Sequence, residues 1–385
     1  MPTFNGPLKS KLPKTGTSIF SVMSSLAVEH KAINLSQGFP GFDISMDLVN
    51  LVNKYMKQGF NQYAPMPGIL PLRERIAEKV QKQYSAVYNP DKEITITAGG
   101  TQGLYTAIAC SIREKDEVII FDPAYDCYAP AVVLAGGVPV HVELKYPDFH
   151  IDWNDVKKLI SQRTRMIIIN TPHNPSGAVL SAKDMQMLEK LTTKTDILIL
   201  SDEVYEHVIF DGYEHQSVMR YPKLAERSFV IFSFGKTFHT TGWKMGYCIA
   251  PENLTAEFRK VHQFMVFSAN TPVQYAYADF MSDEKNHSGI DSFYQSKRDR
   301  FLRLIQGSRF KPLGCSGSYF QLLHYSKITQ EKDIDFAVRL TKENGVASIP
   351  VSAFYKNGTD HKLLRFCFAK DDEMLERAAE KLMAV

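Results

Sequence analysis

Short apolar runs alternate with longer helix-like segments between about residues 94 and 250, and this alternation constrains the fold more than any other feature of the chain. Each run has a nearly unbroken apolar core of four to six residues, as expected of strands covered on both faces. Strands that alternate with helices are typical of βαβ units. The pattern therefore predicts an α/β fold with a mainly parallel central sheet and helices on both faces. The runs lie in EITITAGG (93–100), DEVIIFDPAY (116–125), RMIIINTPHNPSG (165–177), DILILSDEVY (196–205), SFVIFSFGK (228–236) and GYCIA (246–250).

The pattern changes after about residue 285, where a strand-like run, a helix-like segment, two further strand-like runs and a terminal helix follow one another. This order predicts a smaller C-terminal α+β domain over residues 285–385, beside a large domain over residues 45–284. Residues 1–44 are expected to form an N-terminal arm and part of the small domain. No low-complexity linker separates the parts, so they should pack tightly.

The composition of the 385-residue chain argues against several classes of partner. Its 45 lysines and arginines and 42 aspartates and glutamates give a net charge of +3, and no run of like charges suggests nucleic acid. The five cysteines are widely spaced without a C-x-x-C pair, so neither a metal site nor a disulfide framework is expected. No stretch approaches the roughly 20 apolar residues that span a bilayer, and the first fifteen residues lack an apolar signal region. We therefore expect a soluble, cytoplasmic protein.

Glycine, polar and aromatic residues follow the predicted strands directly. Open α/β sheets bind ligands outside the carboxyl ends of their strands, so these residues should converge on one edge. They are Gly99 and Gly100, Tyr125, Asn174, Asp202 with Tyr205, and Lys236.

The segment TAGGTQG (97–103) has the form of a strand, a glycine-rich turn and the start of a helix. Free N–H groups and the helix dipole favour a phosphate at such a place. The segment matches neither a Walker loop nor a dinucleotide fingerprint, and an ordinary tight turn is the alternative.

The other polar positions each have a structural as well as a functional interpretation. Asp202 follows the buried run ILILS, so its carboxylate needs an ion pair, a helix to cap or a ligand. Tyr205 would share its side if the chain turns helical there. Asn174 could form an Asx turn between two prolines, and Tyr125 could be ordinary packing. Arg365, inside the apolar run KLLRFCFA, could equally form an internal salt bridge or clamp a substrate carboxylate.

Lys236 is the most informative of these positions. A lysine at a partly buried strand end has a lowered pKa, so its amine can act as a nucleophile or base. A solvated surface lysine is the alternative, but it leaves unexplained why the residues before Lys236 are small or apolar. A phosphate cradle, an aspartate and such an amine together suit pyridoxal phosphate, which carries a phosphate, a pyridinium ring and a carbonyl that condenses with lysine.

The sequence resembles the fold-type I, class I/II pyridoxal-phosphate-dependent aminotransferases over nearly its whole length. Within that family it is most similar to bacterial methionine aminotransferases and to the kynurenine aminotransferase and glutamine transaminase K group. The motifs that carry the resemblance appear in the family's order and are NQYAPMPG, AGGTQG, DPAYDCY, NTPHNPSG, SDEVYEH, SFGKTFHTTGWKMGY and LLRFCFA.

The resemblance implies a role for each candidate residue. Lys236 would be the Schiff-base lysine, Asp202 would pair with the ring nitrogen, and Tyr205 would bond the 3′-oxygen together with Asn174. Tyr125 would stack on the ring. The phosphate would be held by Gly99, Gly100, Thr101, Ser233 and Lys244, with Tyr63 contributed by the neighbouring subunit of a homodimer whose active sites lie at the subunit interface. The α-carboxylate of the substrate would bind Gly38, Asn174 and Arg365, and its side chain would meet Phe20, Phe39 and Phe267.

The expected activity is a ping-pong transfer of the α-amino group of methionine and of aromatic or other apolar amino acids to a 2-oxo acid, with Lys236, Asp202 and Tyr205 as catalytic residues. No obvious second arginine is available to read a side-chain carboxylate, which favours these substrates over aspartate. The alternative is a kynurenine or glutamine transaminase with cysteine-S-conjugate β-lyase activity, because that chemistry uses the same lysine and cofactor.

Overall fold

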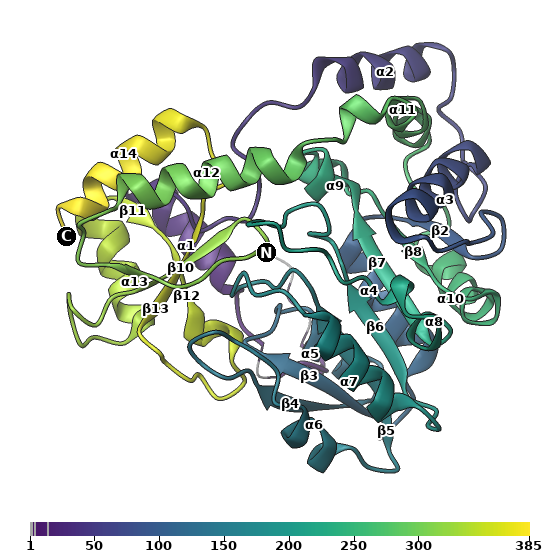
Figure 1. Ribbon diagram of the computed structural model, residues 1–385, viewed down its shortest axis with the longest axis horizontal. Helices are drawn as coiled ribbons and strands as arrows, with labels where there is room; N and C mark the ends of the chain where they lie inside the picture. The colour runs from purple at the N-terminus through teal and green to yellow at the C-terminus, as the bar shows by residue number, and fades with distance from the viewer. Residues whose placement is uncertain (1–2, 4, 14) are drawn as a thin grey trace.

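A seven-stranded sheet forms the centre of the protein in the computed structural model, which describes residue 3, residues 5–13 and residues 15–385 (Figure 1). The strand order is β2-β8-β7-β6-β5-β3-β4. Strand β8 runs antiparallel to both of its neighbours, and the pairs from β7 to β4 are all parallel. The α/β fold with a mainly parallel central sheet is thereby confirmed. The strands are β2 (Ile94–Thr97), β3 (Glu117–Asp122), β4 (Val138–Glu143), β5 (Thr164–Asn170), β6 (Leu198–Asp202), β7 (Ser228–Ser233) and β8 (Gly246–Ile249).

Helices cover both faces of this sheet, which explains the unbroken apolar runs. In β5, Ile167 and Ile169 enter one hydrophobic core, whereas Met166 and Ile168 enter another on the opposite face. Successive side chains of a strand point to opposite faces, so both sets must be apolar when both faces are buried. The first core includes α3 (Leu70–Tyr84), α7 (Ala182–Thr192) and α11 (Thr271–Met281), and the second includes α4 (Gly100–Ser111), α5 (Tyr128–Leu134) and α10 (Glu252–Met265).

Strand β4 is the one member of the large sheet that the apolar runs do not reveal. It lies at the edge of the sheet, pairs with β3 only, and contains Pro139 and His141. Most of its residues are partly or fully exposed. An edge strand tolerates proline and polar residues because one side of its backbone needs no partner, so its sequence pattern is weak.

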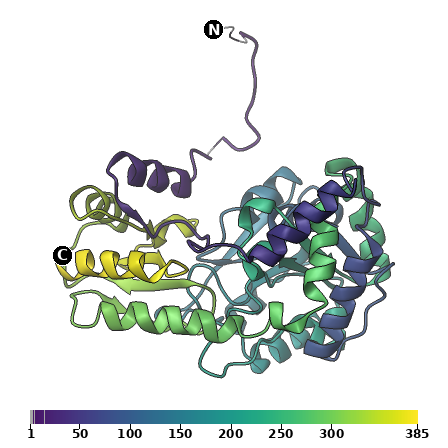
Figure 2. The same cartoon turned by 90° about the horizontal axis from the view of Figure 1, so that it is seen from above.

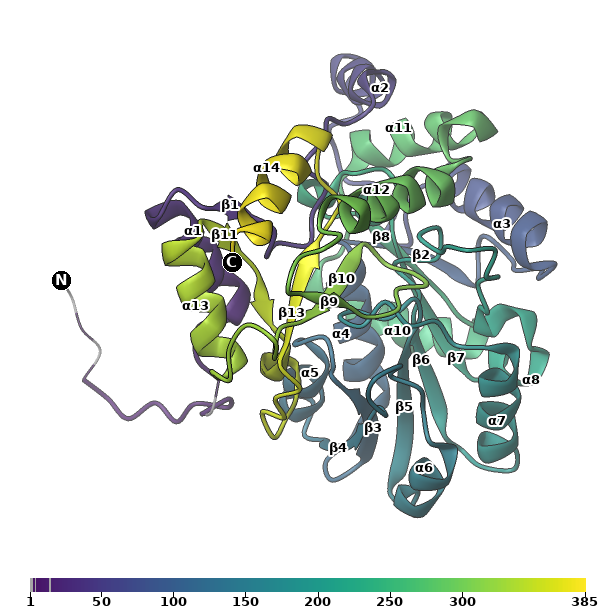
Figure 3. The same cartoon turned by 60° about the vertical axis from the view of Figure 1, so that its left-hand side comes forward.

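A smaller antiparallel sheet lies beside the large one, in the order β12-β13-β10-β9 (Figure 3). Residues close to both ends of the chain meet here, because β1 (Ile33–Asn34) pairs in parallel with β11 (Val346–Ala347). A third hydrophobic core holds this part together. Its remaining elements are β9 (Lys311–Pro312), β10 (Phe320–His324), β12 (Ile349–Pro350), β13 (Leu363–Cys367), α1 (Ile19–Glu29), α12 (Ile290–Leu304), α13 (Asp333–Glu343) and α14 (Asp372–Met383).

Residues 5–13, which precede α1, extend away from the rest of the chain (Figure 2). On the other side of the molecule, α2 (Met46–Lys57) packs against α11 at the far end of the large sheet (Figure 1). Over the described ranges, no helix is both long and apolar enough to cross a membrane.

Replacing Ile167 with alanine tests the doubly covered sheet. Ile167 is fully buried in the middle of β5, so Ile167→Ala should lower the free energy of unfolding by about 2–5 kcal/mol, as large-to-small core changes do. Urea denaturation followed by circular dichroism measures the change. Val138→Ala on the exposed edge strand is the control and should have a much smaller effect; equal effects of the two substitutions would contradict the burial described here.

Candidate active site

A cavity of about 350 Å³ lies at the carboxyl ends of the parallel strands, between the large sheet and the smaller one. Most of the residues singled out from the sequence line it. From the large sheet and its helices these are Gly99, Gly100, Thr101, Tyr125, Asn174, Asp202, Tyr205, Ser233, Lys236 and Lys244, and from the smaller part they are Phe20, Gly38 and Arg365. The ends of distant strands thus meet at one place, as the topology requires.

Three predicted residues do not line this cavity. Tyr63 is 82% exposed, and its ring stacks edge-on against Phe267, which is 44% exposed. Phe39 is also 44% exposed and lies beside Lys370, whose ammonium is 4.2 Å from the centre of its ring. These three aromatic side chains therefore stand on the surface of the single chain.

Lys236 projects into the cavity from α9 (Phe234–Thr237), the short helix that follows β7. Its Nζ atom donates to the hydroxyl oxygen of Tyr319 at 2.7 Å and to the carbonyl oxygen of Gly38 at 2.9 Å. Burial lowers the pKa of Lys236 to about 8, and the nearby positive charges of Arg365 and Lys244 act in the same direction. A substantial fraction of the amine is therefore free at mildly alkaline pH, which a nucleophile or base requires.

Asp202 ends β6 with its side chain almost completely buried. It accepts hydrogen bonds from the hydroxyl of Tyr128 at 2.5 Å and from the backbone N–H of Val204 at 3.3 Å. Burial raises the pKa of Asp202 to about 6, against the effect of these two hydrogen bonds. No lysine, arginine or histidine forms an ion pair with it in the part of the chain that the structure describes. A positively charged group in the cavity would relieve this cost, since an adjacent cation favours the ionised carboxylate.

The glycine-rich turn opens α4 onto the same cavity. Gly99 is the residue that precedes the helix, with φ of 84°, and no side chain of the described residues caps the first N–H groups of the helix. Lys244 approaches from the other side, so that a Cβ atom added to Gly99 would lie 3.5 Å from its Nζ atom. The first turn of a helix and an ammonium group together attract an anion.

Arg365 is fully buried on β13, with its guanidinium stacked 3.9 Å from the ring centre of Phe320. Its Nη1 donates to Oδ1 of Asn174 at 2.7 Å and its Nη2 to the carbonyl oxygen of Ser36 at 2.9 Å. Its Nε has no hydrogen-bond partner among the described residues, and no carboxylate forms an ion pair with the side chain. Burial lowers the pKa of Arg365 to about 10, so it stays charged at neutral pH. The internal salt bridge considered from the sequence is not formed.

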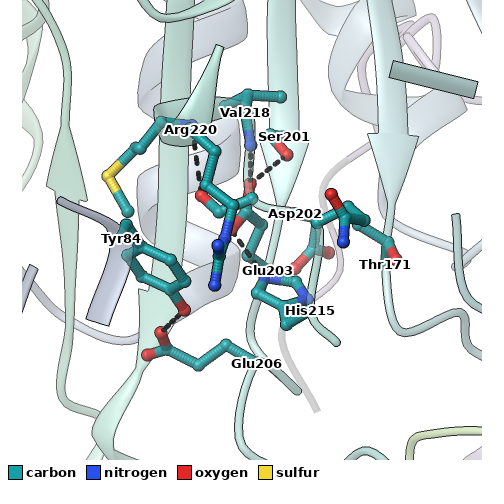
Figure 4. A network of polar contacts seen from close by, with 12 residues as sticks. Tyr84, Thr171, Ser201, Asp202, Glu203, Glu206, His215, Val218 and Arg220 are labelled. Atoms are coloured by element: carbon teal, nitrogen blue, oxygen red, sulfur yellow. Dashed lines mark hydrogen bonds and ion pairs between the residues drawn. The ribbon is translucent and has the colours of Figure 1, made fainter. Parts of the chain in front are cut away.

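A buried polar network surrounds Glu203 and Glu206, which follow Asp202 in the chain (Figure 4). Glu203 accepts from Ser201 Oγ at 2.7 Å and from the Val218 N–H at 3.1 Å, and it lies 2.8 Å from His215 Nε2. Glu206 bonds to the ammonium of Lys79 and to the hydroxyl groups of Tyr84 and Tyr247. Burial acts to raise the pKa of Glu206, but Lys79, His207 and the hydrogen bond from Tyr84 together outweigh burial, and the pKa falls to about 2. The buried side chains of Glu203 and Glu206 therefore hold the backbone beside Asp202 in place. Removing either one would leave its buried partners without their hydrogen bonds.

Three residues of the site were missed in the sequence. Tyr128 lies within the motif DPAYDCY, three residues after Tyr125, but nothing in the motif shows that its hydroxyl reaches Asp202. Tyr319 looks like one aromatic of the strand-like run GSYFQLLHY. Asn170 ends β5 and donates to the carbonyl oxygen of Asp202 at 2.9 Å. Of these three residues, only Asn170 could have been recognised from the sequence, because it is a polar residue at the end of a predicted strand.

Comparisons with known proteins agree with this geometry. The model of the family "Aminotransferase class I and II" matches residues 30–382. A methionine aminotransferase of Escherichia coli (strain K12) is 48% identical over 381 residues, covering 98% of this chain and 99% of that protein. Kynurenine–oxoglutarate transaminase 1 of Mus musculus is 33% identical, covering 93% and 92% of the two chains. The crystal structure of an E. coli protein with a methionine aminotransferase function superimposes with a TM-score of 0.95 at 46% identity, covering 98% and 100%.

The carboxylate of Asp202 is buried without an ion-pair partner among the described residues, so the free energy of unfolding should fall as the pH rises. The folded pKa of about 6 lies above the ordinary value of 3.8, so ionisation opposes folding as the pH rises from about 4 to 6. Relative to the wild type, Asp202→Asn should therefore gain up to about 3 kcal/mol of unfolding free energy across this range and no more above it. Urea midpoints of protein freed of bound small molecules provide the measurement.

Asp43 offers a control for this substitution, because it is exposed and forms no ion pair with any residue that the structure describes. Asp43→Asn should show no comparable gain between pH 4 and 6. If Asp202→Asn behaves like Asp43→Asn, the carboxylate of Asp202 has a compensating partner that this structure does not show.

Proposed function

The chain belongs to the class I and II aminotransferase family, and from this premise we propose that it uses pyridoxal phosphate to move the α-amino group of methionine and of aromatic or other apolar amino acids to a 2-oxo acid. The observation that carries the proposal is the convergence of three groups on one cavity. These are the amine of Lys236, the unpaired carboxylate of Asp202 and the anion-attracting turn at Gly99.

The residues around the cavity fit this cofactor part by part. The uncapped start of α4, with Thr101, Ser233 and Lys244 beside it, suits a phosphate. The carboxylate of Asp202 suits a protonated pyridine nitrogen, whose charge would remove the penalty that now raises the pKa of Asp202. Tyr125 offers an aromatic face, and Lys236 offers an amine that can condense with the aldehyde.

Bound pyridoxal phosphate would supply an electron-withdrawing ring that stabilises negative charge at the substrate's Cα atom. The residues of the chain would supply position and proton transfer. Asp202 would keep the ring nitrogen protonated, and Asn174 and Tyr205 would orient the ring through its 3′-oxygen. The free amine of Lys236, whose pKa is about 8, would take the proton from the substrate's Cα atom. The same amine would then deliver this proton to the carbonyl carbon of the cofactor.

Arg365 is the group best suited to the substrate's α-carboxylate. Asn174 and Ser36 hold its two terminal nitrogens, which fixes the plane of the guanidinium, and its Nε remains free of a partner within the described residues. A carboxylate would satisfy this buried charge, and the backbone of Gly38 lies at the same cavity.

The side chain of the substrate would meet an apolar wall. Phe20 and Phe320 line the cavity beside Arg365. The basic residues that line it are Lys236, Lys244 and Arg365, each with a role above, so among the described residues no further arginine is available for a second carboxylate. This supports methionine and aromatic amino acids, and the substrate named for the E. coli relative points the same way.

We also propose a homodimer in which each subunit completes the site of the other. The edge-to-face pair Tyr63 and Phe267 is exposed in the single chain, although large aromatic side chains are usually covered. A second copy of the chain would cover this pair and bring Tyr63 to the phosphate of the opposite site. Phe267 would then join the substrate pocket.

A cytoplasmic location is part of the same proposal. It is supported by the five cysteines, none of which forms a disulfide. A reducing compartment suits such thiols.

Removing the amine of Lys236 tests the proposed chemistry. Lys236→Ala should lose the visible absorption band of the lysine-bound cofactor and at least about 10⁴-fold in kcat with methionine and a 2-oxo acid, because the other lysine that lines the cavity, Lys244, lies beside Gly99 at the proposed phosphate site. Absorption spectra and coupled assays measure both effects. Lys183→Ala, on the surface of α7, is the matched control and should behave as the wild type. Normal transamination by Lys236→Ala would refute the proposal.

The substrate preference can be measured separately. A panel of amino acids with several 2-oxo acids should give the highest kcat/KM for methionine and aromatic amino acids, and aspartate should be at least about 100-fold poorer because its second carboxylate has no partner. The relatives named kynurenine–oxoglutarate transaminases favour one alternative, a kynurenine transaminase with β-lyase activity. Pyruvate and ammonia released from cysteine conjugates without any added 2-oxo acid would identify that alternative.

A further inference from the structure

A second cavity, of about 720 Å³, lies beside the active site and has no part in the proposed function. One wall is the segment 144–151 that follows β4, and the opposite wall comes from residues 311–316 and 324–327 around β9 and β10. It is about twice as large as the active-site cavity and falls within the roughly 300–1,000 Å³ of typical small-molecule sites.

The interior of this second cavity is apolar and aromatic. Phe121, Leu144, Phe149 and Ile151 line it, and each is less than 9% exposed. Tyr146 adds another ring at the partly exposed side. A surface of this kind favours a ligand with an aromatic or aliphatic body, because burying apolar area drives binding.

Two lysines and two aspartates line this cavity, and among the described residues only the lysine side chains have no hydrogen-bond or ion-pair partner. Lys311 and Lys327 line it, are exposed, and form no ion pair within the described residues. Asp184 also lines it, but both of its oxygens already accept hydrogen bonds, from Trp153 and from Ser181. Asp148 is engaged by His150 at 2.9 Å. Burial and Lys311 lower the pKa of His324, which favours its neutral form, so this ring adds no charge to the cavity. The complementary group on a ligand is therefore a carboxylate.

The two cavities share a wall. Tyr128 lines the second cavity, and its hydroxyl donates to Asp202 in the first. Asn170 lines both cavities; its amide donates to the carbonyl oxygen of Asp202, and its Oδ1 accepts the N–H of Asn174 at 2.8 Å. A molecule in the second cavity would thus touch the two side chains that hold Asp202 and the loop of Asn174.

We propose that the second cavity is an effector site for an aromatic monocarboxylate, which acts on the active site through Tyr128 and Asn170. The carboxylate lies near Lys311 and Lys327, and the aromatic body lies on Phe121 and Phe149. Occupancy changes the turnover of the enzyme without competing with the amino acid, because the ligand displaces nothing from the active-site cavity.

Calorimetric titration of the holoenzyme with indole-3-butyrate tests binding. Gly314 lines the cavity, and a Cβ atom there would meet nothing within 4 Å, so Gly314→Trp places a large side chain at the cavity wall without a backbone clash. This variant should weaken binding at least about tenfold.

Lys311→Met combined with Lys327→Met should weaken binding about fivefold, the effect of losing two exposed charge contacts. The controls are Gly16→Trp, at another open glycine, and Lys57→Met with Lys190→Met, and both should bind as the wild type.

A binding site for the probe in the first cavity is the competing outcome. If the probe binds there, Arg365→Leu would abolish binding, Gly314→Trp would leave binding unchanged, and the probe would inhibit in competition with methionine. This result would overturn the proposal. The absence of any binding at millimolar concentrations of the probe would also overturn it. We expect instead that Arg365→Leu retains binding and that the probe changes kcat in the wild type but not in Gly314→Trp. The kinetic measurement rests on the proposed function, whereas the calorimetric measurement does not. Failure of the proposed function would therefore affect only the kinetic result, and failure of the effector site would also remove the calorimetric one.

Discussion

The buried carboxylate of Asp202 is the constraint on which the rest of the site depends. A negative charge at the end of a buried strand, without an ion-pair partner among the described residues, is unfavourable, and its raised pKa of about 6 expresses that cost. The chain retains it through Tyr128, the N–H of Val204 and the network behind Glu203 and Glu206 (Figure 4). A cationic ligand beside Asp202 would be stabilised by the carboxylate, whereas the protein without a ligand bears the cost of burying that charge. This is why the same residue is unfavourable for folding and suited to binding.

The two parts of the chain contribute differently to the cavity. The large sheet supplies groups whose positions are fixed by strand ends, namely Asp202, Lys236 and the turn before α4. The smaller part supplies Arg365 and the aromatic residues around it, from strands built by residues far away in the sequence. Cofactor chemistry would therefore rest on the rigid sheet, and selection of the substrate on the smaller part. Arg365 joins the two, because its fork bonds Asn174 of the large part and Ser36 of the N-terminal segment.

The sequence was sufficient for the sheet and for most of the cavity, because strands buried on both faces leave unbroken apolar runs and the residues after them must share one edge. Strand β4 escaped because an edge strand has no such run. The roles of Tyr128 and Tyr319 depend on where a hydroxyl points, which spacing does not fix. Tyr63, Phe39 and Phe267 lie outside the cavity of a single chain. The proposed roles of Tyr63 and Phe267 rest on a second subunit, which one sequence does not place. The second cavity is formed by segments 144–151 and 311–327, whose proximity only the folded structure reveals.

The central claim is that one small molecule bridges Lys236, Asp202 and the start of α4. A crystal structure of the protein soaked with pyridoxal phosphate tests it most directly. The account predicts a covalent bond to Lys236 Nζ, the ring nitrogen within hydrogen-bond distance of Asp202, and the phosphate on the N–H groups of Gly100 and Thr101 beside Lys244. Pyridoxal phosphate bound elsewhere, or bound here with its ring nitrogen away from Asp202, would contradict it.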